Sequence, residues 1–449
     1  MKRSSGIAVV ILAALCVSLG VGRAQGVPES LEYTYPGVAT HPGPVPTGTV
    51  INMQNWQEYK QYIPDGLQYM MAGQTFWKFP KDFQIVIGPT HDFPLPKEFN
   101  DDTRKYADQV RIINLPDGGH TIDGYVAGLP FPNPSEPLKG WKILVNMWYV
   151  YVPHLFCNYD TFYLLDRFGN MQSETSIQIY RKLSHISDYG QPVNDPDASG
   201  IYYSEYLMLT APEQVKYTAN LTLYYTDLSK PIDTFLFIPA LRRSLRLSVA
   251  ARCSPVVGTD YAQDDANKSN FNGDWRIFNA DVVSEGQTMQ MMAINGWKAV
   301  GNLNNYYQPV FFPKPDIGHF EIRPTWKLAV SRIPSHSMGY CYAKSVFYVD
   351  KETYVSQNKE IYDAAGKFWK MTEEIFIGRN IPHEGYTDDN DNWFGPMWDM
   401  QAGHLTMGMS TTPEGTPMHF NDQCKDFQGE NFDDISRYSL ASGMNEILR

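Results

Sequence analysis

Charged side chains that could bind an anion or a carboxylate are concentrated between residues 235 and 273. Three arginines in a predicted strand are followed, one turn-rich loop downstream, by three aspartates: Arg242, Arg243, Arg246, Asp260, Asp264 and Asp265. If residues 241–249 form a strand, Arg243 shares a face with leucines and the other two arginines share the opposite face. An unpaired buried arginine costs several kcal/mol, so the pattern predicts an Arg–Asp clasp that pins the loop to the sheet. In the alternative, Arg242 and Arg246 bind the anionic head of a ligand or a partner protein.

Large apolar side chains on the predicted strands are candidates for lining a ligand pocket. They are Tyr217, Leu221, Leu223, Tyr225, Trp326 and Met291. Methionine and aromatic side chains suit an adaptable apolar pocket, but they also fill ordinary cores. A sheet curved around a cavity and a sheet packed on helices use the same residues, so both interpretations stay open.

Motifs for metal-dependent or nucleophilic chemistry are weak. The spacing of an EF-hand calcium loop is matched in part by Asp388, Asn390, Asn392 and Asp399. However, Trp393 stands where the sharp turn of that loop needs glycine, so we expect an Asx-turn-rich loop without metal. The sequence contains no G-x-S-x-G, Walker A, G-x-G-x-x-G or H-E-x-x-H motif. We therefore expect no cofactor and no enzyme activity, although a triad of dispersed residues stays possible.

The cysteines that follow the N-terminal apolar segment are far apart in the sequence: Cys157, Cys253, Cys341 and Cys424. Four cysteines in an oxidising compartment allow three pairings, and the sequence does not choose among them. No C-x-x-C motif is present, which argues against a thioredoxin-like site or a close-spaced zinc site. We interpret them as scattered structural cysteines or one disulfide.

Period-two alternation of apolar and polar residues predicts the elements that position these side chains. It is clearest over 215–225 and recurs over 176–179 and 326–331. One apolar and one polar face is typical of antiparallel sheets, and no β-α-β alternation supports a doubly wound fold. Helical spacing predicts helices over 53–63 and 99–110. From about residue 388 onward we expect long loops and short helices that cover the sheet. The expected fold class is mainly β (α+β).

The N-terminal residues have the features of an export signal. Lys2 and Arg3 precede an apolar run over 6–19, and Ala24 offers a cleavage position. This predicts a signal peptide over 1–24, an N-terminal arm with helices over 25–120, and a sheet domain over 121–449 that ends in a covering segment.

Composition restricts the partners. The 449 residues carry a formal net charge of -12, which argues against non-specific binding to nucleic acid. Aromatic residues make up 14% of the chain, which favours a β-rich fold with large apolar surfaces to bury.

Several segments between about residues 120 and 370 resemble a known family. They read GYVAGLPFPNP at 124–134, PALRR at 239–243, FNG at 271–273, RPTWKLAV at 323–330 and AKSVFYVDKETY at 343–354. Together they resemble an uncharacterised family of exported Gram-negative proteins that is placed with the LolA/LolB lipoprotein-carrier superfamily. The resemblance implies a strongly curved antiparallel sheet, a half-open barrel whose apolar concave face is covered by helices and long loops. It also implies a periplasmic location, association with the outer membrane, and service to RND-type exporters and outer-membrane proteins.

The resulting hypothesis is a non-enzymatic periplasmic carrier or binder of a hydrophobic molecule that resembles a lipid, sterol or hydrocarbon. Its expected partners are that molecule, an RND-type exporter and an outer-membrane protein, and not nucleic acid. One alternative is an accessory subunit that docks to an exporter or outer-membrane protein, which predicts an exposed patch. Another is a periplasmic hydrolase, which predicts a cleft where carboxylates and a histidine converge with perturbed pKa values.

Overall fold

The computed structural model describes residues 38–190, 192–247, 252–253, 255–256, 258–265, 270–381, 385–388 and 394–448. One sheet of 15 strands dominates this part of the chain. Its strands follow one another in space in the order β12 (Arg243–Arg246), β11 (Asp233–Ile238), β10 (Ala219–Tyr225), β9 (Ile201–Ala211), β8 (Met171–Lys182), β7 (Leu155–Leu165), β24 (His404–Met409), β23 (Gly395–Asp399), β19 (Phe368–Glu373), β18 (Ser356–Asp363), β17 (Tyr342–Asp350), β16 (His319–Arg332), β13 (Phe278–Met292) and β20 (Ile375–Phe376), with β25 (His419–Phe420) beside β7.

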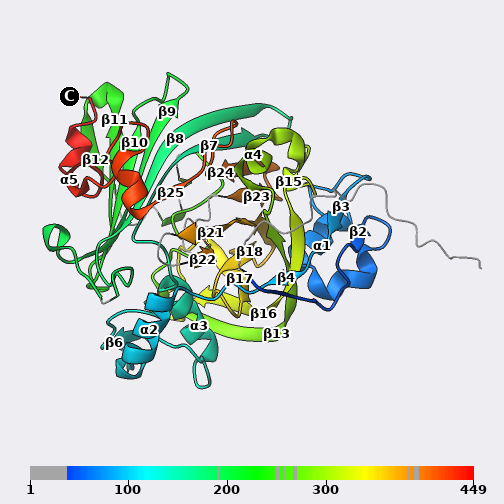
Figure 1. Ribbon diagram of the computed structural model, residues 1–449, viewed down its shortest axis with the longest axis horizontal. Coiled ribbons are helices and arrows are strands. Elements are labelled where there is room, and N and C mark those ends of the chain that lie inside the picture. Colours follow the sequence, from blue (N-terminus) through cyan, green and yellow to red (C-terminus); the bar gives the residue numbers. More distant parts are fainter. Residues whose placement is uncertain are drawn as a thin grey trace, which may run out of the picture.

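The pairing within this sheet is antiparallel except for the short parallel contact between β13 and β20. Register shifts interrupt several pairs, as between Val282 and Ser284 in β13 and between Tyr224 and Tyr225 in β10. Such irregularities bend strands and increase their twist. The sheet accordingly curls around a central region, with β7–β12 on one side and β13 and β16 on the other (Figure 1). The predicted curved antiparallel sheet is confirmed.

Helices and small two-stranded sheets surround the large sheet. The helices are η1 (Trp56–Tyr62), α1 (Asp65–Met71), α2 (Lys97–Tyr106), η2 (Ala107–Gln109), α3 (Lys139–Trp148), η3 (Pro196–Ala198), η4 (Pro239–Leu241), η6 (Trp275–Ile277), α4 (Gly296–Gly301), η7 (Leu303–Asn305), η8 (Pro334–His336), η9 (Asn421–Asp426), α5 (Ile435–Tyr438) and η10 (Gly443–Asn445). The small sheets pair β1 (Thr40–His41) with β4 (Thr90–His91), β2 (Val50–Asn52) with β3 (Gln84–Val86), β5 (Arg111–Asn114) with β6 (His120–Asp123), β14 (Tyr306–Tyr307) with β15 (Phe312–Pro313), and β21 (Gly378–Ile381) with β22 (Gly385–Asp388). None of the helices among the described residues has the length and apolar character that a membrane span requires.

The concave side of the sheet is filled by α3 and by the segment around η6. One cluster of buried side chains includes Trp141 and Trp148 of α3 together with Tyr203 of β9 and Leu328 of β16. Through this cluster α3 connects strands from both arms of the sheet. Trp275 of η6 packs edge-on against Trp141, with ring centroids 5.5 Å apart.

The convex side is covered by both ends of the described chain. The C-terminal segment packs on β7–β11, where Phe427, Phe432 and Tyr438 meet Leu221 and Leu223. The N-terminal segment through η1 and α1 covers another part of the sheet, where Met70 and Met371 belong to one buried cluster. In Figure 1 these segments, red and blue, lie at opposite ends of the molecule. The sheet is therefore buried on both faces over much of its area.

Two disulfides fix loops to this framework, where the sequence suggested one disulfide or none. Cys157 of β7 bonds to Cys424 of η9 and ties the C-terminal segment to the sheet. Cys253 bonds to Cys341 and ties the segment before η6 to the residue preceding β17.

Several sequence predictions about elements hold and others are wrong. Helix α2 confirms the helix predicted over 99–110, and η1 lies within the one predicted over 53–63. The strand predicted over 241–249 is wrong at its start, because Arg242 follows η4 in the left-handed region with φ 48° and β12 covers only 243–246. The loops expected after residue 388 are also partly wrong: β23 and β24 are central strands of the large sheet, and only the chain from residue 419 onward covers it with short helices.

Candidate ligand-binding cavity

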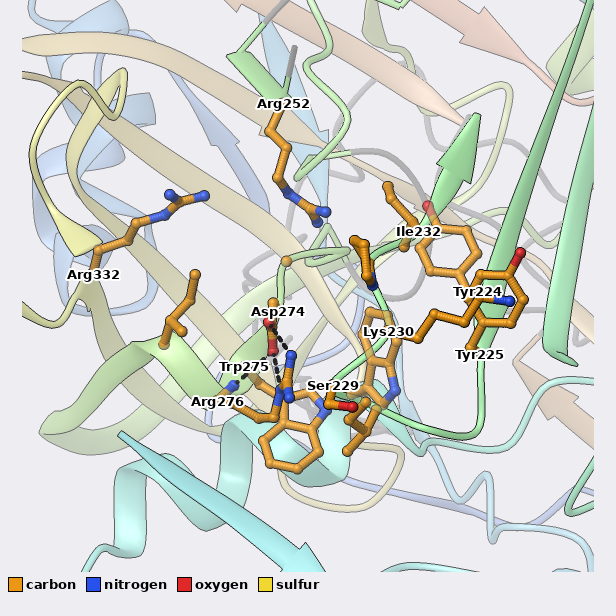
Figure 2. A pocket seen from close by; sticks show the side chains of 15 residues that line it. Tyr224, Tyr225, Ser229, Lys230, Ile232, Arg252, Asp274, Trp275, Arg276 and Arg332 are labelled. Atoms are coloured by element: carbon orange, nitrogen blue, oxygen red, sulfur yellow. Dashed lines mark hydrogen bonds and ion pairs between the residues drawn. The ribbon is translucent and has the colours of Figure 1, made fainter. Parts of the chain in front are cut away.

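A cavity of about 230 Å³ opens between the end of β10, the loop that follows it, and η6. Its lining comes from α3, β10, the β10–β11 loop, η6 and the end of β16: Trp148, Tyr224, Tyr225, Leu228, Ser229, Lys230, Pro231, Ile232, Arg252, Gly273, Asp274, Trp275, Arg276, Ile277 and Arg332. Figure 2 shows the labelled side chains pointing toward this space from several sides. Elements far apart in the sequence therefore form one site.

The apolar part of the cavity is aromatic. Trp148 and Trp275 are almost fully buried, and Tyr224 stacks on Tyr203 with ring centroids 4.0 Å apart. The Trp148 ring meets both tyrosines at 5.9 Å in edge-to-face geometry. The Tyr224 hydroxyl donates to Glu205 at 3.2 Å and accepts from Asn272 at 2.6 Å. These contacts fix the rings, so the apolar wall is formed before any ligand arrives.

Two arginines are held on one side of the cavity by a shared carboxylate. Arg252 donates its Nε–H to Asp264 and an Nη2–H to the Asn272 carbonyl at 2.8 Å. Arg332 Nη2 lies 3.4 Å from the other Asp264 oxygen, and its guanidinium carbon lies 3.7 Å from the centre of the Tyr340 ring. Burial lowers the pKa of Arg252, but Asp264 more than offsets this and leaves the pKa raised. Both groups are therefore positioned cations.

Two further cations complete the rim. Arg276 binds Asp274 through two parallel hydrogen bonds of 2.8 and 2.7 Å, visible in Figure 2. Lys230 is exposed, and its Nζ lies 3.3 Å from the centre of the Tyr225 ring. The lining thus holds four cations and one carboxylate. Behind it, Asp264 pairs with Arg252 and Arg332, and Glu205 and Asp233 accept from the Tyr224 and Tyr225 hydroxyls. In a chain with a net charge of -12, the side chains that line the cavity thus carry more positive than negative charges.

The arginines predicted from the sequence lie elsewhere, and the predicted clasp partners are wrong. Arg246 donates to Asp233 rather than to the downstream aspartates, and its side chain is 62% exposed at the sheet edge. Arg242 and Arg243 are also exposed, and neither forms an ion pair with another of the described residues. The reason is the left-handed turn at Arg242, which ends the predicted alternation.

The three predicted aspartates do anchor their loop, but to other side chains. Asp260 accepts from Thr406 and contacts His404, each at 2.8 Å. Asp265 accepts from Lys359 and from the Tyr342 hydroxyl, each at 2.5 Å. These partners lie on β24, β18 and β17, so the loop is anchored to three strands of the large sheet.

Of the predicted pocket-lining side chains, Tyr225 lies in the cavity wall. Leu221 and Leu223 face the other way and pack beneath the C-terminal segment. Met291 and Trp326 belong to two different buried clusters. Tyr217 lies in the turn before β10 and is 36% exposed. Its φ of 68° is not compatible with a strand, so β10 begins at Ala219 and not at residue 215 as predicted.

The predicted calcium loop is described only at its ends. Asn390 and Asn392 lie outside the described residues, and Asp388 contributes backbone pairing to β22. Asp399 is used within its own turn, where one oxygen accepts from Gln401 and Ala402 and the other accepts from the Trp369 indole at 2.8 Å.

The sequence interpretation missed Trp148, Arg252, Trp275, Arg276 and Arg332. Two signals were available. Tyr224 interrupts the alternation of its strand with an aromatic at a polar position, and a Trp-Arg pair at 275–276 directly follows the FNG segment. Both mark aromatic residues that face the concave interior.

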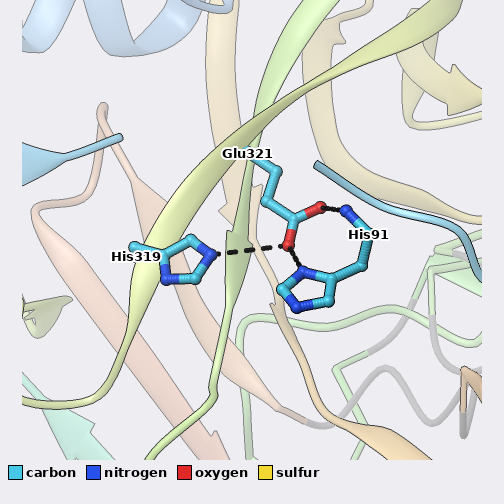
Figure 3. A group of neighbouring side chains, drawn as sticks. All are labelled: His91, His319 and Glu321. Carbon is cyan, nitrogen blue, oxygen red and sulfur yellow. Dashed lines mark hydrogen bonds and ion pairs between the residues drawn. The ribbon is translucent and has the colours of Figure 1, made fainter. Parts of the chain in front are cut away.

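A second cluster of ionisable groups lies away from this cavity. His91 of β4 and His319 and Glu321 of β16 converge in Figure 3. Their relative exposures are 1%, 1% and 0%, so the cluster is sealed from solvent. Burial acts to raise the pKa of Glu321, but His319, His91 and the charge of Arg323 outweigh it and hold the pKa at about 2.

These features define a class: a curved antiparallel sheet, buried on both faces, that encloses an amphipathic cavity with aromatic walls and a cationic rim. The chain belongs to the family described as protein of unknown function (DUF1329), whose model matches residues 50–436. This confirms the resemblance to an uncharacterised family. An uncharacterised protein of Pseudomonas aeruginosa is 22% identical over 385 residues, which cover 80% of this chain and 75% of that protein.

Three solved structures are similar to the chain. A domain from Vibrio parahaemolyticus described as an outer membrane lipoprotein-sorting protein has a TM-score of 0.43 at 14% identity, covering 63% of this chain and 93% of its own. A DUF1329 family protein from Desulfovibrio piger has a TM-score of 0.42 at 13% identity, covering 66% and 98%. A LolA superfamily protein from Nitrosomonas europaea has a TM-score of 0.35 at 13% identity, covering 61% and 89%.

Proposed function

We propose that the protein is a non-enzymatic binder or carrier of a hydrophobic molecule that bears an anionic group. The observation that carries this proposal is the cavity itself, which places fixed aromatic rings next to a cationic rim. Aromatic walls give non-directional affinity of about 25 cal/mol for each Å² of apolar area removed from water. The arginines add selectivity, because a charged hydrogen bond is worth about 1.5–3 kcal/mol.

The size of the cavity restricts how a ligand binds. Pockets that enclose a drug-sized molecule measure about 300–1,000 Å³, and this cavity measures about 230 Å³. It therefore suits the charged end of an amphipathic molecule together with the first part of its apolar body. A fatty acid or an anionic sterol derivative has this chemistry, and partial enclosure favours release to a partner.

The place of action that we propose is the periplasm, in service of an envelope transport system. The predicted signal peptide supports export, and the two disulfides support an oxidising compartment. An RND-type exporter or an outer-membrane protein is the proposed recipient of the ligand. The sealed position of the histidine–glutamate cluster supports a non-enzymatic role, because a substrate does not reach side chains at 0–1% exposure.

Two dyes that share one ring system test the cavity. The probes are neutral N-phenyl-1-naphthylamine and 1-anilinonaphthalene-8-sulfonate, which carries the same rings with an added sulfonate. We expect both to gain fluorescence with the purified mature protein. The double variant Lys230→Gln/Arg332→Gln should weaken the sulfonate dye about 10–100-fold, the equivalent of one charged hydrogen bond, and leave the neutral dye unchanged.

The matched control is Arg246→Gln, which removes an exposed arginine at the sheet edge. It should bind both dyes like the wild type, and Trp148→Leu should weaken both. Equal loss of the sulfonate dye in Arg246→Gln and in the double variant would refute the cavity as the site. Organic extraction of the purified protein followed by mass spectrometry identifies the natural ligand. The carrier proposal fails if no amphipathic molecule is extracted and neither dye binds.

A further inference from the structure

His91, His319 and Glu321 bring metal-binding atoms together from two distant parts of the chain. His319 and Glu321 are two positions apart in β16, so their side chains point to the same side of the strand. His91 ends β4, and the partner of that strand, β1, belongs to the N-terminal segment. One ligand atom from each of the three lies within 4.8 Å of the others.

The spacing of His319 and Glu321 fits one small cation, and His91 joins the set once the cation replaces its hydrogen bond to Glu321. His319 Nε2 lies 3.5 Å from Glu321 Oε1, and His91 Nδ1 contacts the same oxygen. Zinc binds imidazole nitrogen and carboxylate oxygen at about 2.0–2.2 Å, which places tetrahedral ligand atoms roughly 3.3 Å apart. Figure 3 shows both rings directed at the carboxylate. Two histidines and one carboxylate form a set that divalent transition metals favour.

His319 is the residue that a purely hydrogen-bonded cluster does not explain. Its ring is 1% exposed. Among the described residues neither ring nitrogen makes a hydrogen bond, and Nε2 has only the 3.5 Å contact with Glu321. A buried polar atom without a partner costs about 1–3 kcal/mol. The ring is also confined, because a Cβ added at Gly88 would lie 1.9 Å from its Cδ2 atom. A cation at Nε2 would satisfy the nitrogen without moving the ring.

The surrounding charges favour a dication. Arg323 contacts three carboxylates: Glu321 at 3.2 Å, Asp350 at 2.5 Å and Glu352 at 2.7 Å. One guanidinium balances one of these negative charges, so the group retains a formal charge of -2 when all three are ionised. A divalent cation beside Glu321 neutralises that excess, and Glu321 and Asp350 themselves are buried, whereas the Glu352 side chain is 36% exposed.

We propose that His91, His319 and Glu321 bind a divalent transition-metal ion that fastens the N-terminal segment to β16. The role is structural, because the ligands are sealed from substrate. The site does not depend on the ligand cavity. Zinc and ferrous iron share this ligand chemistry, and the metal content of the purified protein distinguishes them.

The experiment uses the full mature chain with its disulfides intact. Protein stripped by a chelator is dialysed against Zn²⁺, desalted and measured by inductively coupled plasma mass spectrometry. We expect one zinc per chain in the wild type and in His336→Gln, a control that removes a more exposed histidine paired with Asp117. In His319→Gln the affinity should fall by more than the ~10–100-fold that loss of a supporting residue costs. With Co²⁺ in place of Zn²⁺, the wild type should show the visible absorption of a tetrahedral site, and His319→Gln should not.

Specific results would overturn the metal-site proposal. A wild type that retains neither zinc, iron nor cobalt overturns the proposal, and so does a folded His319→Gln variant that retains zinc like the wild type. If His319→Gln does not fold, Glu321→Gln takes its place. The wild-type thermal midpoint must also rise with added Zn²⁺, and an unchanged midpoint refutes the structural role. Dye binding by the cavity is measured on the same samples, so each proposal can fail alone.

Discussion

Replacing Cys157 and Cys424 by alanine removes the bridge that holds the C-terminal segment on the sheet. The two residues are 267 positions apart, and the second bridge, between Cys253 and Cys341, closes 88 positions inside that loop. With the inner bridge intact, subtracting 88 from 267 leaves a closed path of about 180 residues. The chain-entropy relation then gives about 5 kcal/mol for the outer bridge and about 4.6 kcal/mol for the inner one.

The stabilisation from the two disulfides is large relative to the total free energy of unfolding of a domain. A folded domain is stable by about 5–15 kcal/mol, and the two bridges together amount to about 10 kcal/mol. We therefore expect either pair of alanines to leave a folded but weakened protein. We expect all four alanines together to leave a chain that is largely unfolded at room temperature. Because Cys157 and Cys424 are fully buried, alanine is preferred to serine there.

The assay is urea unfolding at fixed pH and ionic strength, followed by tryptophan fluorescence, with the free thiols of each variant counted by mass spectrometry. The mature wild type, which lacks Cys16 of the predicted signal peptide, must show no free thiol. The reasoning is refuted if the four-alanine variant unfolds within about 1 kcal/mol of the wild type, since the relation predicts a loss roughly ten times larger. Equal stability of the wild type with and without reductant would refute it as well.

Two further changes test the buried charges. Arg323→Met leaves Glu321 and Asp350 buried without their guanidinium and should lower the free energy of unfolding by about 3–5 kcal/mol in urea; a change below 1 kcal/mol would contradict the assigned pairing. The Asp260 contact raises the pKa of His404, so protonated His404 stabilises the folded state below the unfolded pKa of about 6.5, and this contribution is lost as pH rises through the folded value. Compared with His404→Gln, the wild type should lose stability as the pH rises above the unfolded pKa of about 6.5 and through the raised folded pKa. Parallel pH profiles for the two proteins would contradict this coupling.

The sequence predicted strands well where polar and apolar residue types alternate, and it failed where they do not. The alternation over 219–225 matches β10, although Tyr224 faces the concave cluster. By contrast, all five residues of β23 are buried, so no alternation marked it. Helix α3 was not predicted from the sequence for a related reason. Its residues from Gly140 to Trp148 are buried except Lys142, so the helix lacks the wide polar face that gives a helical pattern of polar and apolar residues.

The cavity could not be predicted from the sequence, because tertiary contacts bring its lining residues together from distant segments. The segment between residues 235 and 273 was correctly singled out as rich in arginine and aspartate, and Asp264 holds the rim. Its arginine partners, however, are Arg252 and Arg332 rather than Arg242 or Arg246. Choosing among arginines required the left-handed turn at Arg242 and a strand that lies 68 positions from Asp264 in the sequence. Neither is encoded in local periodicity.

The two proposed sites lie at opposite ends of one strand. Arg332 ends β16 at the ligand cavity, and His319 begins it at the histidine–glutamate cluster. A strand rises about 3.3 Å per residue, so the two positions are roughly 40 Å apart along the backbone. At that distance a metal ion has no direct electrostatic effect on a bound anion, because the Debye length at physiological ionic strength is about 8 Å. A metal effect on dye affinity would therefore have to pass through the packing of β16 against the N-terminal segment. We accordingly expect Zn²⁺ to raise the thermal midpoint and leave the affinity for the sulfonate dye unchanged.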